Sequence, residues 1–157
     1  NLIETNLIDA ELCYANLSDA DLGKANLNRA KLMSAQFSKA ILCVTKLGEA
    51  NLERACFFMA LLNGVDLRKA NLDAAVFDHA ILLGTNLLGS EWLTKKQFQG
   101  DNPPFLCGVA LPDNLIEEGI DPNRDCDCLP QVLSERYGYY LEDAQKFVDD
   151  ARQTTWD

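Results

Sequence analysis

The sequence predicts an all-β solenoid over residues 1–90, followed by a short helical segment. Leucine or phenylalanine occupies every fifth position from Leu2 to Leu87, eighteen times without a gap. Counting in fives from position 5 to position 90, thirteen of eighteen positions hold alanine. A period of five fits neither a helix nor a strand. A short fixed repeat is typical of a solenoid, in which each unit buries its apolar residue by stacking on its neighbours.

The repeating unit is alanine, then asparagine or aspartate, then leucine, then two variable residues, and it is plain in residues 15–29. It resembles the repeat of the pentapeptide-repeat family across residues 1–90. The resemblance implies a right-handed, four-sided β-helix. Each pentad would form one side, four pentads would form one coil of twenty residues, and the central and small side chains would point inward. Eighteen pentads then give about 4.5 coils.

Two patterns in the sequence test the twenty-residue coil independently. The phenylalanines at central positions are Phe37, Phe57 and Phe77, so a coil of twenty stacks them as a ladder in the core. Charge gives the second test, because neighbouring rungs of a sheet favour opposite signs. At a separation of twenty, seven opposite-sign pairs occur and one like-sign pair, Glu53/Asp73. The opposite pairs are Glu4/Lys24, Asp9/Arg29, Glu11/Lys31, Asp19/Lys39, Arg29/Glu49, Lys46/Asp66 and Glu49/Lys69.

The repeat ends near Ser90, and residues 91–157 are expected to form a C-terminal capping segment, since solenoid ends need covers. Ser90 would begin a short helix over 91–98, with Trp92 as a plug over the last leucine layer. Residues 105–128 look irregular. Two further helices are expected at 129–137 and 140–152, the second of them amphipathic. This pair is expected to cap the C-terminal end or to lie along the rod, and the alternative is that it binds a partner.

Six cysteines bear on the compartment, three in the repeats and three in the tail. The favoured pairing joins Cys107 to Cys126 or Cys128, which closes a loop of about twenty residues and implies an oxidising compartment. Free, buried cysteines are the alternative. The tail thiols lack the spacing of a zinc site, so no metal is expected.

No catalytic constellation is visible, and the chain is therefore expected not to be an enzyme. His79 is the one histidine of the sequence and is expected to point outward from the wall. No nucleophile elbow or phosphate-binding glycine loop occurs, so neither a cofactor nor a small-molecule substrate is expected. No run of eighteen apolar residues exists, so membrane insertion is not expected.

One side of the predicted coil carries apolar residues where the repeat prefers asparagine or aspartate. A contiguous strip of this kind is a candidate contact surface for a partner protein or for self-association. The alternative is that the C-terminal tail folds back over it. The candidate residues are Ile41, Leu61, Ile81, Val44, Leu83, Phe58 and Val76.

Two functions follow from these expectations. The first is a non-enzymatic protein-binding module of rigid, patterned walls. The second comes from the resemblance, since some pentapeptide-repeat proteins mimic DNA and inhibit topoisomerases. The net charge of −10 suits such mimicry, but residues 1–90 carry ten acidic and eight basic side chains and are nearly neutral. The rod is also short, so mimicry is disfavoured. No basic patch indicates nucleic-acid binding.

The pairing of a short rod with a cysteine-bearing, two-helix tail resembles the thylakoid-lumen pentapeptide-repeat proteins of plants and cyanobacteria. The resemblance rests on Cys107, Cys126, Cys128 and residues 129–151. It implies a location in the thylakoid lumen and no established activity. The sequence opens in mid-repeat, so a targeting peptide is expected to lie outside it.

Overall fold

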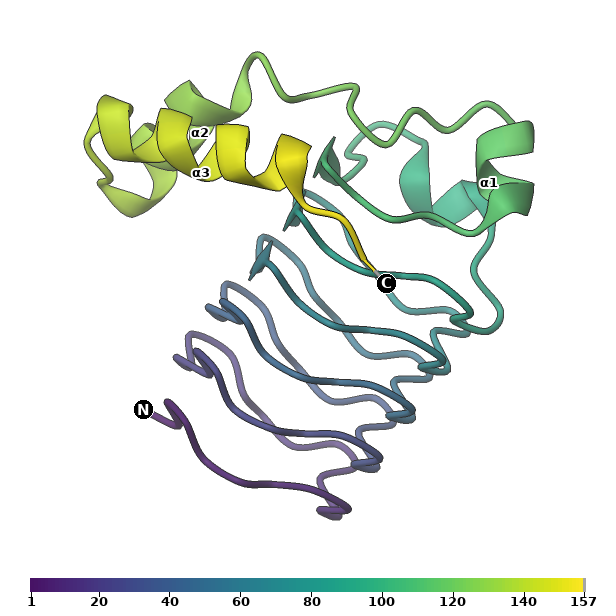
Figure 1. Cartoon of the computed structure of the whole chain (residues 1–157). Helices are drawn as coiled ribbons and strands as arrows, with labels where there is room; N and C mark the ends of the chain where they lie inside the picture. The colour runs from purple at the N-terminus through teal and green to yellow at the C-terminus, as the bar shows by residue number, and fades with distance from the viewer. Residues whose placement is uncertain (157) are drawn as a thin grey trace.

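The computed structural model describes residues 1–156 and shows a rod of stacked coils with helices gathered at its C-terminal end (Figure 1). Parallel bridges join residues twenty positions apart, from Asn6↔Asn26 to Asn71↔Glu91. Four five-residue units therefore complete one coil, which is the length predicted from the phenylalanine and charge spacing. The coils are held by backbone pairing along the rod, as in a parallel sheet.

A single unit shows how the backbone repeats. The Leu22 N–H donates to the Ile41 carbonyl of the next coil at 2.8 Å, and the Lys24 N–H donates to the Cys43 carbonyl at 2.7 Å. The Ala25 N–H bonds back to the Leu22 carbonyl at 2.9 Å and closes a turn. Lys24 adopts a φ of 57° there. Every corner of the rod is thus a tight turn. In each turn, the residue two places after the central leucine or phenylalanine has the left-handed conformation.

Asparagine and aspartate before the central residue stabilise these corners through their side chains. The Asp21 Oδ1 accepts a hydrogen bond from the Gly23 N–H at 3.0 Å, and the Asn26 Oδ1 accepts from the Asn28 N–H at 3.2 Å. Such a local bond offers the backbone a turn in place of continued extension. The residue preference of the repeat therefore has a direct structural cause.

The core is a narrow apolar bore. Every central leucine or phenylalanine from Leu22 to Leu87 is fully buried. Phe37 and Phe57 stack with ring centroids 4.9 Å apart, and Phe57 and Phe77 stack at 5.3 Å, so the three phenylalanines lie in one column. Polar side chains inside the bore are hydrogen-bonded: the Thr45 hydroxyl donates to the Leu22 carbonyl at 2.8 Å.

The parallel ladder continues past residue 90, beyond the predicted end of the five-residue repeats. The strands β1 (Leu61–Asn63), β2 (Ile81–Leu83) and β3 (Phe105–Cys107) form one parallel sheet in that order. β3 pairs with β2 at a separation of 24 rather than 20, as in Leu82↔Leu106. Four extra residues therefore enter the last coil, and they hide its repeat from a search in steps of five.

The residues after Ser90 also differ from the prediction. Trp92 is 68% exposed and does not plug the bore. A shorter 3-10 helix, η1 (Lys95–Phe98), begins after Thr94, and Phe98 stacks on Phe77 with centroids 6.2 Å apart. Phe98 is fully buried, so it extends the phenylalanine column. The Ser90 hydroxyl donates to the Leu87 carbonyl at 2.6 Å and so does not cap a helix.

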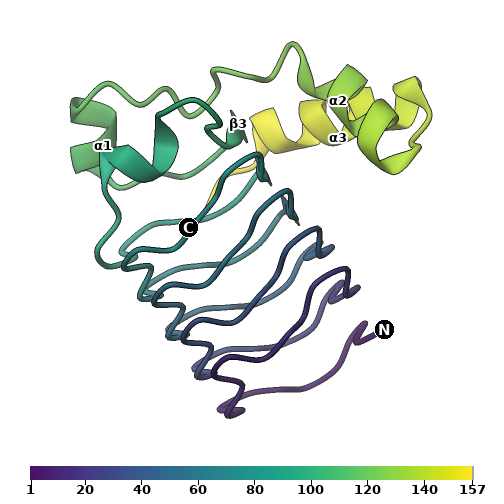
Figure 2. The same cartoon turned by 180° about the vertical axis from the view of Figure 1, so that it is seen from behind.

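Three α-helices complete the C-terminal segment, and they lie in two places. α1 (Asp113–Glu117) falls in the stretch expected to be irregular, and its Leu115 packs into the core of the rod. α2 (Leu129–Tyr137) and α3 (Leu141–Gln153) occupy nearly the ranges predicted for them. Seen from behind, α1 and the α2–α3 pair lie over opposite edges of the rod end (Figure 2).

Glycine at one corner lets α3 approach the rod closely. Gly84 and Gly108 occupy the left-handed turn position, with φ of 58° and 63°. A Cβ on Gly108 would lie 2.1 Å from the Ala151 carbonyl oxygen, and a Cβ on Gly84 would lie 3.5 Å from the Ala151 Cβ. The last turn of α3 therefore rests directly on the backbone of two successive coils, which a side chain at Gly108 would prevent.

We predict that Gly108→Ala destabilises the fold by at least about 2 kcal/mol, because it adds a backbone clash to the left-handed strain. Gly64→Ala is the matched control, since Gly64 has a similar φ of 66° but only the Val44 Cγ2 near it, at 3.8 Å. Urea denaturation measures both changes, and hydrogen exchange reports the protection of α3. Equal losses in the two variants would show that strain alone matters.

Candidate functional site

The helices α2 and α3 cover three of the seven residues that the sequence offered as a contact surface. Leu61, Ile81 and Leu83 are buried, with 2% of Leu61 exposed, in a cluster that includes Leu129, Leu133, Ala144 and Val148 of the helices. These three residues are therefore not available to a partner, and the alternative in which the tail folds back holds for them. The physical reason is that an amphipathic helix pair buries its own apolar face against the strip.

Side chains of α2 also bond to carbonyls that the ladder leaves unpaired. In the described coils, the carbonyl of each left-handed turn residue accepts no backbone hydrogen bond. The Arg136 Nη1 donates to the His79 carbonyl at 2.7 Å, and the Tyr137 hydroxyl donates to the Met59 carbonyl at 2.9 Å. The Arg136 guanidinium also lies 5.0 Å from the centre of the Phe105 ring. The corner therefore supplies acceptors that fix α2 in position.

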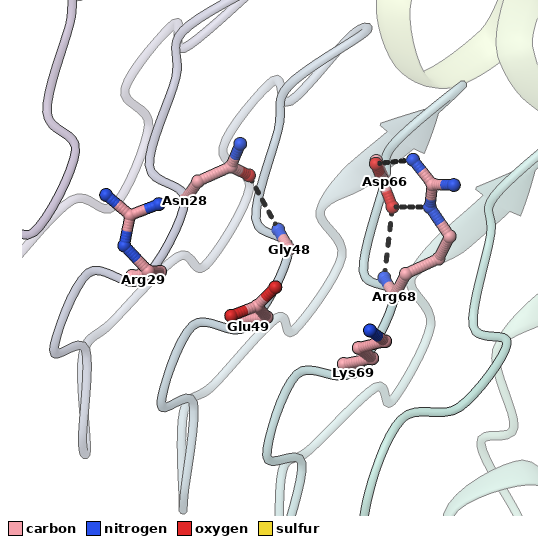
Figure 3. A pocket seen from close by; sticks show the side chains of 7 residues that line it. All are labelled: Asn28, Arg29, Gly48, Glu49, Asp66, Arg68 and Lys69. Atoms are coloured by element: carbon pink, nitrogen blue, oxygen red, sulfur yellow. Dashed lines mark hydrogen bonds and ion pairs between the residues drawn. The ribbon is translucent and has the colours of Figure 1, made fainter.

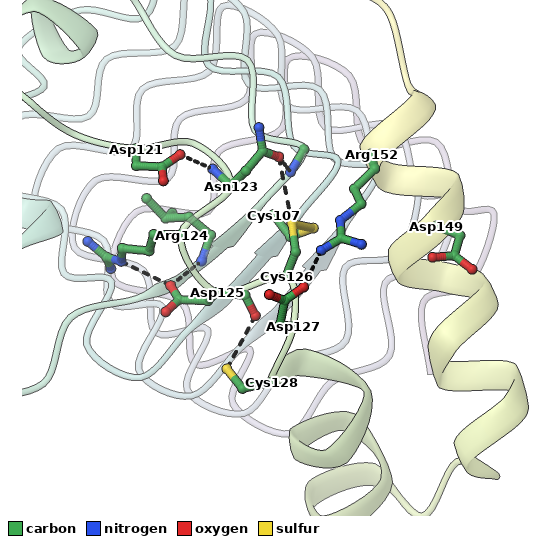
Figure 4. The surroundings of a disulfide bond; sticks show 12 residues. Cys107, Asp121, Asn123, Arg124, Asp125, Cys126, Asp127, Cys128, Asp149 and Arg152 are labelled. Atoms are coloured by element: carbon green, nitrogen blue, oxygen red, sulfur yellow. Dashed lines mark hydrogen bonds and ion pairs between the residues drawn. A yellow bond between two sulfur atoms is a disulfide. The ribbon is translucent and has the colours of Figure 1, made fainter.

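A disulfide joins the last strand to the segment that leads into α2 (Figure 4). It links Cys107 of β3 to Cys126, with the two Cα atoms 4.9 Å apart, which is the first of the two pairings that the sequence left open. Cys128 is exposed and its thiol donates to the Asp125 carbonyl at 3.2 Å. The bond closes a separation of 19 residues in the part of the chain with the least regular structure.

The same segment completes the hydrogen bonds of the last strand. The Asp125 Oδ2 accepts from the Leu106 N–H at 2.9 Å, and the Asn123 Oδ1 accepts from the Gly108 N–H at 2.9 Å (Figure 4). These side chains take the place of a further strand, so the edge of β3 is covered and cannot pair with another chain. Neither residue could be predicted from the sequence, because nothing in the local pattern of either marks a strand edge.

Three of the seven candidate contact residues remain exposed. Val44, Phe58 and Val76 have 55%, 37% and 40% of their surface accessible. Ile41 is half-buried and lines a hollow of about 460 Å³ between the rod corner and α2, which Met59 and Tyr137 also line. Exposed apolar side chains on an otherwise polar wall are typical of interaction surfaces.

A second hollow, of about 300 Å³, lies on a polar wall (Figure 3). The Arg68 Nη2 bonds to the Asp66 Oδ2 at 2.8 Å inside it. Burial raises the pKa of Asp66, but hydrogen bonds from Arg68 and the charges of Arg68 and Lys46 outweigh it and lower that pKa overall. Asp66 and Arg68 therefore neutralise each other inside this hollow. Its lining residues are Asn28, Arg29, Gly48, Glu49, Asp66, Arg68 and Lys69.

The predicted charge pairs are formed in part. Within the described residues, three of the seven meet as ion pairs: Glu4–Lys24 at 3.1 Å, Asp9–Arg29 at 2.9 Å and Glu11–Lys31 at 2.6 Å. The hydrogen bond from Arg29 lowers the pKa of Asp9. All three pairs are exposed and contribute little to stability individually. Each pair joins two successive coils across the wall of the rod.

The described residues offer no recognisable catalytic or metal centre. No group of three or more histidine, cysteine, aspartate or glutamate side chains in residues 1–156 could hold a metal ion. His79 is half-buried and meets the Phe58 ring edge-on, with centroids 5.8 Å apart. Among the described helices, none is both long enough and apolar enough to cross a membrane.

The fold and its surfaces define a class of protein, a parallel β-solenoid with twenty-residue coils and a disulfide-linked helical end. The family model for pentapeptide repeats matches eight copies in residues 1–29, 14–47 and 55–90, which together exceed half of the chain. The chain belongs to the pentapeptide-repeat family, and its fold is of the right-handed β-helix type.

Several solved structures resemble this chain, and no curated protein matches it. The pentapeptide repeat protein Rfr23 from the cyanobacterium Cyanothece 51142 is 33% identical with a TM-score of 0.48, covering 64% of this chain and 62% of that one. HetL, involved in heterocyst differentiation regulation in Nostoc sp. strain PCC 7120, is 29% identical at 0.47, covering 71% and 57%. A pentapeptide repeat protein from the Arabidopsis thaliana thylakoid lumen is 24% identical at 0.47, covering 93% and 87%. The chain thus matches less than two thirds of the length of Rfr23 and HetL.

We predict that Cys126→Ser lowers the free energy of unfolding by about 3 kcal/mol, because a loop of this size is no longer closed in the unfolded chain. Cys128→Ser is the control and should change stability little, since Cys128 is exposed and forms no disulfide. Chemical denaturation without reductant measures both. Mass spectrometry after alkylation should count four free thiols, and six would contradict the disulfide.

We also predict that the protein loses stability in alkaline solution. Burial, reinforced by the Asp21 carboxylate, raises the pKa of Cys43 from 9.0 to about 11, and burial raises the pKa of Tyr137 to about 12. The folded chain holds these protons more tightly than the unfolded chain. Their stabilising contribution is therefore complete below about pH 9 and is lost as the pH rises through about 11.

Urea denaturation between pH 8 and pH 11 tests this expectation. The free energy of unfolding should fall with rising pH, and Cys43→Ala should make the fall shallower while keeping the part of the Tyr137 contribution that comes from burial. An identical slope in the variant would show that the Cys43 thiol is not the group responsible.

Proposed function

We propose that this chain is a non-enzymatic protein-binding module that acts through the surfaces of its rod. The observation that carries the proposal is the exposed pair Phe58 and Val76, which stays uncovered although the helices bury Leu61, Ile81 and Leu83 of the same strip. Solvent contact of two large apolar side chains on a polar wall is unfavourable for the isolated protein. A partner that covers them removes that cost.

The positions of these residues in the repeat support the proposal. Phe58 occupies a column that holds Ser18 and Ser38 in the two coils below. Val76 occupies a column that holds Asn16 and Gln36. The fold therefore tolerates polar residues at both places and does not require the apolar ones. Cys56, half-buried directly below Val76, extends the patch.

In the same proposal, the segment after residue 90 acts as a cap and the protein works in an oxidising compartment. Phe98 and Leu115 close the end of the bore, and Asn123 and Asp125 cover the edge of β3. The Cys107–Cys126 disulfide favours an oxidising environment over the reducing cytosol. The thylakoid lumen, which the sequence resemblance implied, is the compartment we propose.

The alternative, a DNA mimic that inhibits a topoisomerase, has no comparable observation in its favour. Mimicry needs negative charge along the rod where phosphates would lie. Three acidic side chains of the first coil, Glu4, Asp9 and Glu11, instead form ion pairs with basic residues of the second. We therefore retain the protein-binding module as the proposed function.

We predict that the double variant Phe58→Ser, Val76→Asn loses its partner while it keeps its fold, because both substitutions restore residues that other coils carry at the same places. The assay compares tagged wild type and variant for a stoichiometric complex isolated from the native source. Tyr14→Ser is the matched control, since it removes an exposed aromatic ring elsewhere on the rod. Retention of every partner by the double variant, with unchanged thermal unfolding, would refute this surface.

A further inference from the structure

The turn between α2 and α3 exposes two large side chains that are neighbours in the sequence. Tyr140 is 82% exposed and Leu141, the first residue of α3, is 53% exposed. The preceding Tyr139 is anchored to the molecule, because its ring meets Phe147 edge-on with centroids 5.2 Å apart. The turn is therefore a fixed feature of the surface and not a loose loop tip. Tyrosine in such a setting is a common anchor in protein interfaces.

Val44 lies on the same side of the rod as this turn. Tyr139 and Cys43 pack against the same buried cluster, and Val44 follows Cys43 directly in the chain. Val44 is 55% exposed, and the glycine above it, Gly64, leaves its side chain uncovered. We call Val44, Tyr140 and Leu141 the turn surface.

The backbone of Val44 is strained in a way that the fold does not require. It has a φ of 58°, and it is the one β-branched residue among the non-glycine residues of positive φ in residues 1–156. A β-branched side chain is unfavourable in the left-handed region. Most other coils place a polar residue or glycine at this position, so Val44 keeps an exposed apolar group at the expense of backbone strain. Strain of this kind points to a functional role.

Charge around the turn surface indicates the chemistry of what covers it. Glu142 and Asp143 are exposed and follow Leu141 directly. Residues 91–157 as a whole carry fourteen acidic and six basic side chains. A partner that meets both features needs apolar residues flanked by lysine or arginine.

We propose that the turn surface docks a basic amphipathic segment of another protein, with its apolar residues on Val44, Tyr140 and Leu141 and its cations beside Glu142 and Asp143. A second copy of this chain fits poorly, because its own C-terminal segment is acidic. Lys39 and Arg136, which line the hollow beneath α2, confine the cations to the α3 side of the surface. The inference rests on the proposed function in one respect, since both invoke a protein partner.

A designed peptide tests the proposal without knowledge of the natural partner. The probe is an acetylated and amidated 14-residue amphipathic helix of leucine and lysine, compared with a peptide in which every lysine is glutamate. Titration into ¹⁵N-labelled protein should shift the amides of residues 43–44 and 139–143 with the lysine peptide and not with the glutamate peptide. The affinity should fall as salt is raised.

Variants separate the turn surface from general stickiness. Val44→Asn with Leu141→Gln should weaken binding at least tenfold, while Tyr14→Ser, which removes a 72% exposed aromatic ring elsewhere, should change it less than twofold. Glu142→Gln with Asp143→Asn should weaken binding several-fold and flatten its salt dependence. Val44→Asn should fold at least as stably as wild type, because asparagine tolerates the left-handed region.

Equal binding of the two peptides, or unchanged binding to the Val44→Asn, Leu141→Gln variant, would overturn the proposal. The Phe58→Ser, Val76→Asn variant keeps the two claims distinct. If it loses the natural partner while the lysine peptide binds nowhere, the protein-binding function stands and the turn surface falls. If only the Val44→Asn, Leu141→Gln variant loses the partner, the turn surface stands and the Phe58 patch falls.

Discussion

The hydrogen-bonded ladder between residues twenty positions apart is the interaction on which the rest of the structure depends. It requires a left-handed turn every five residues, and asparagine or aspartate beside the central leucine stabilises that turn through a side-chain bond. The ladder also stacks equivalent positions into straight columns. A column in the bore can hold only apolar or internally bonded side chains, whereas a column on a wall is free to vary. The stacking of equivalent positions therefore determines both the core and the surface of the rod.

The columns of the walls then decide where the helices pack. Ile81 and Leu83 provide an apolar surface on which the helices pack. Gly84 and Gly108 have no side chain that would keep α3 away from the rod. The unpaired carbonyl of Met59 receives the Tyr137 hydroxyl, so α2 uses acceptors that the ladder cannot satisfy itself. The helix pair is thus fixed by apolar contact, backbone approach and hydrogen bonds together. The disulfide adds a covalent tie at the last strand.

Much of the rod could be predicted because its signals are local and periodic. The spacing of Phe37, Phe57 and Phe77 alone indicates the coil length, and these rings do stack. The last coil was not predicted because four inserted residues broke the five-residue period. The pattern itself is still present, since residues 105–111 carry leucine, glycine and leucine at the same spacing as residues 81–87. α1 escaped because a five-residue helix carries too little periodicity to detect. The position predicted for Trp92 was wrong because an aromatic residue at the central place of the pentad pattern need not pack into the bore, and Trp92 is exposed.

By itself, the sequence determined the period, the bore, the corner turns and the two long helices, because each depends on neighbours along the chain or on a strict repeat. Only the tertiary structure decided which apolar residues stay in contact with water. Leu61 and Val76 both break the polar pattern of their walls, yet Leu61 lies beneath the helix pair and Val76 remains exposed. The difference follows from where α2 and α3 come to rest, which depends on long-range contacts that no local pattern encodes.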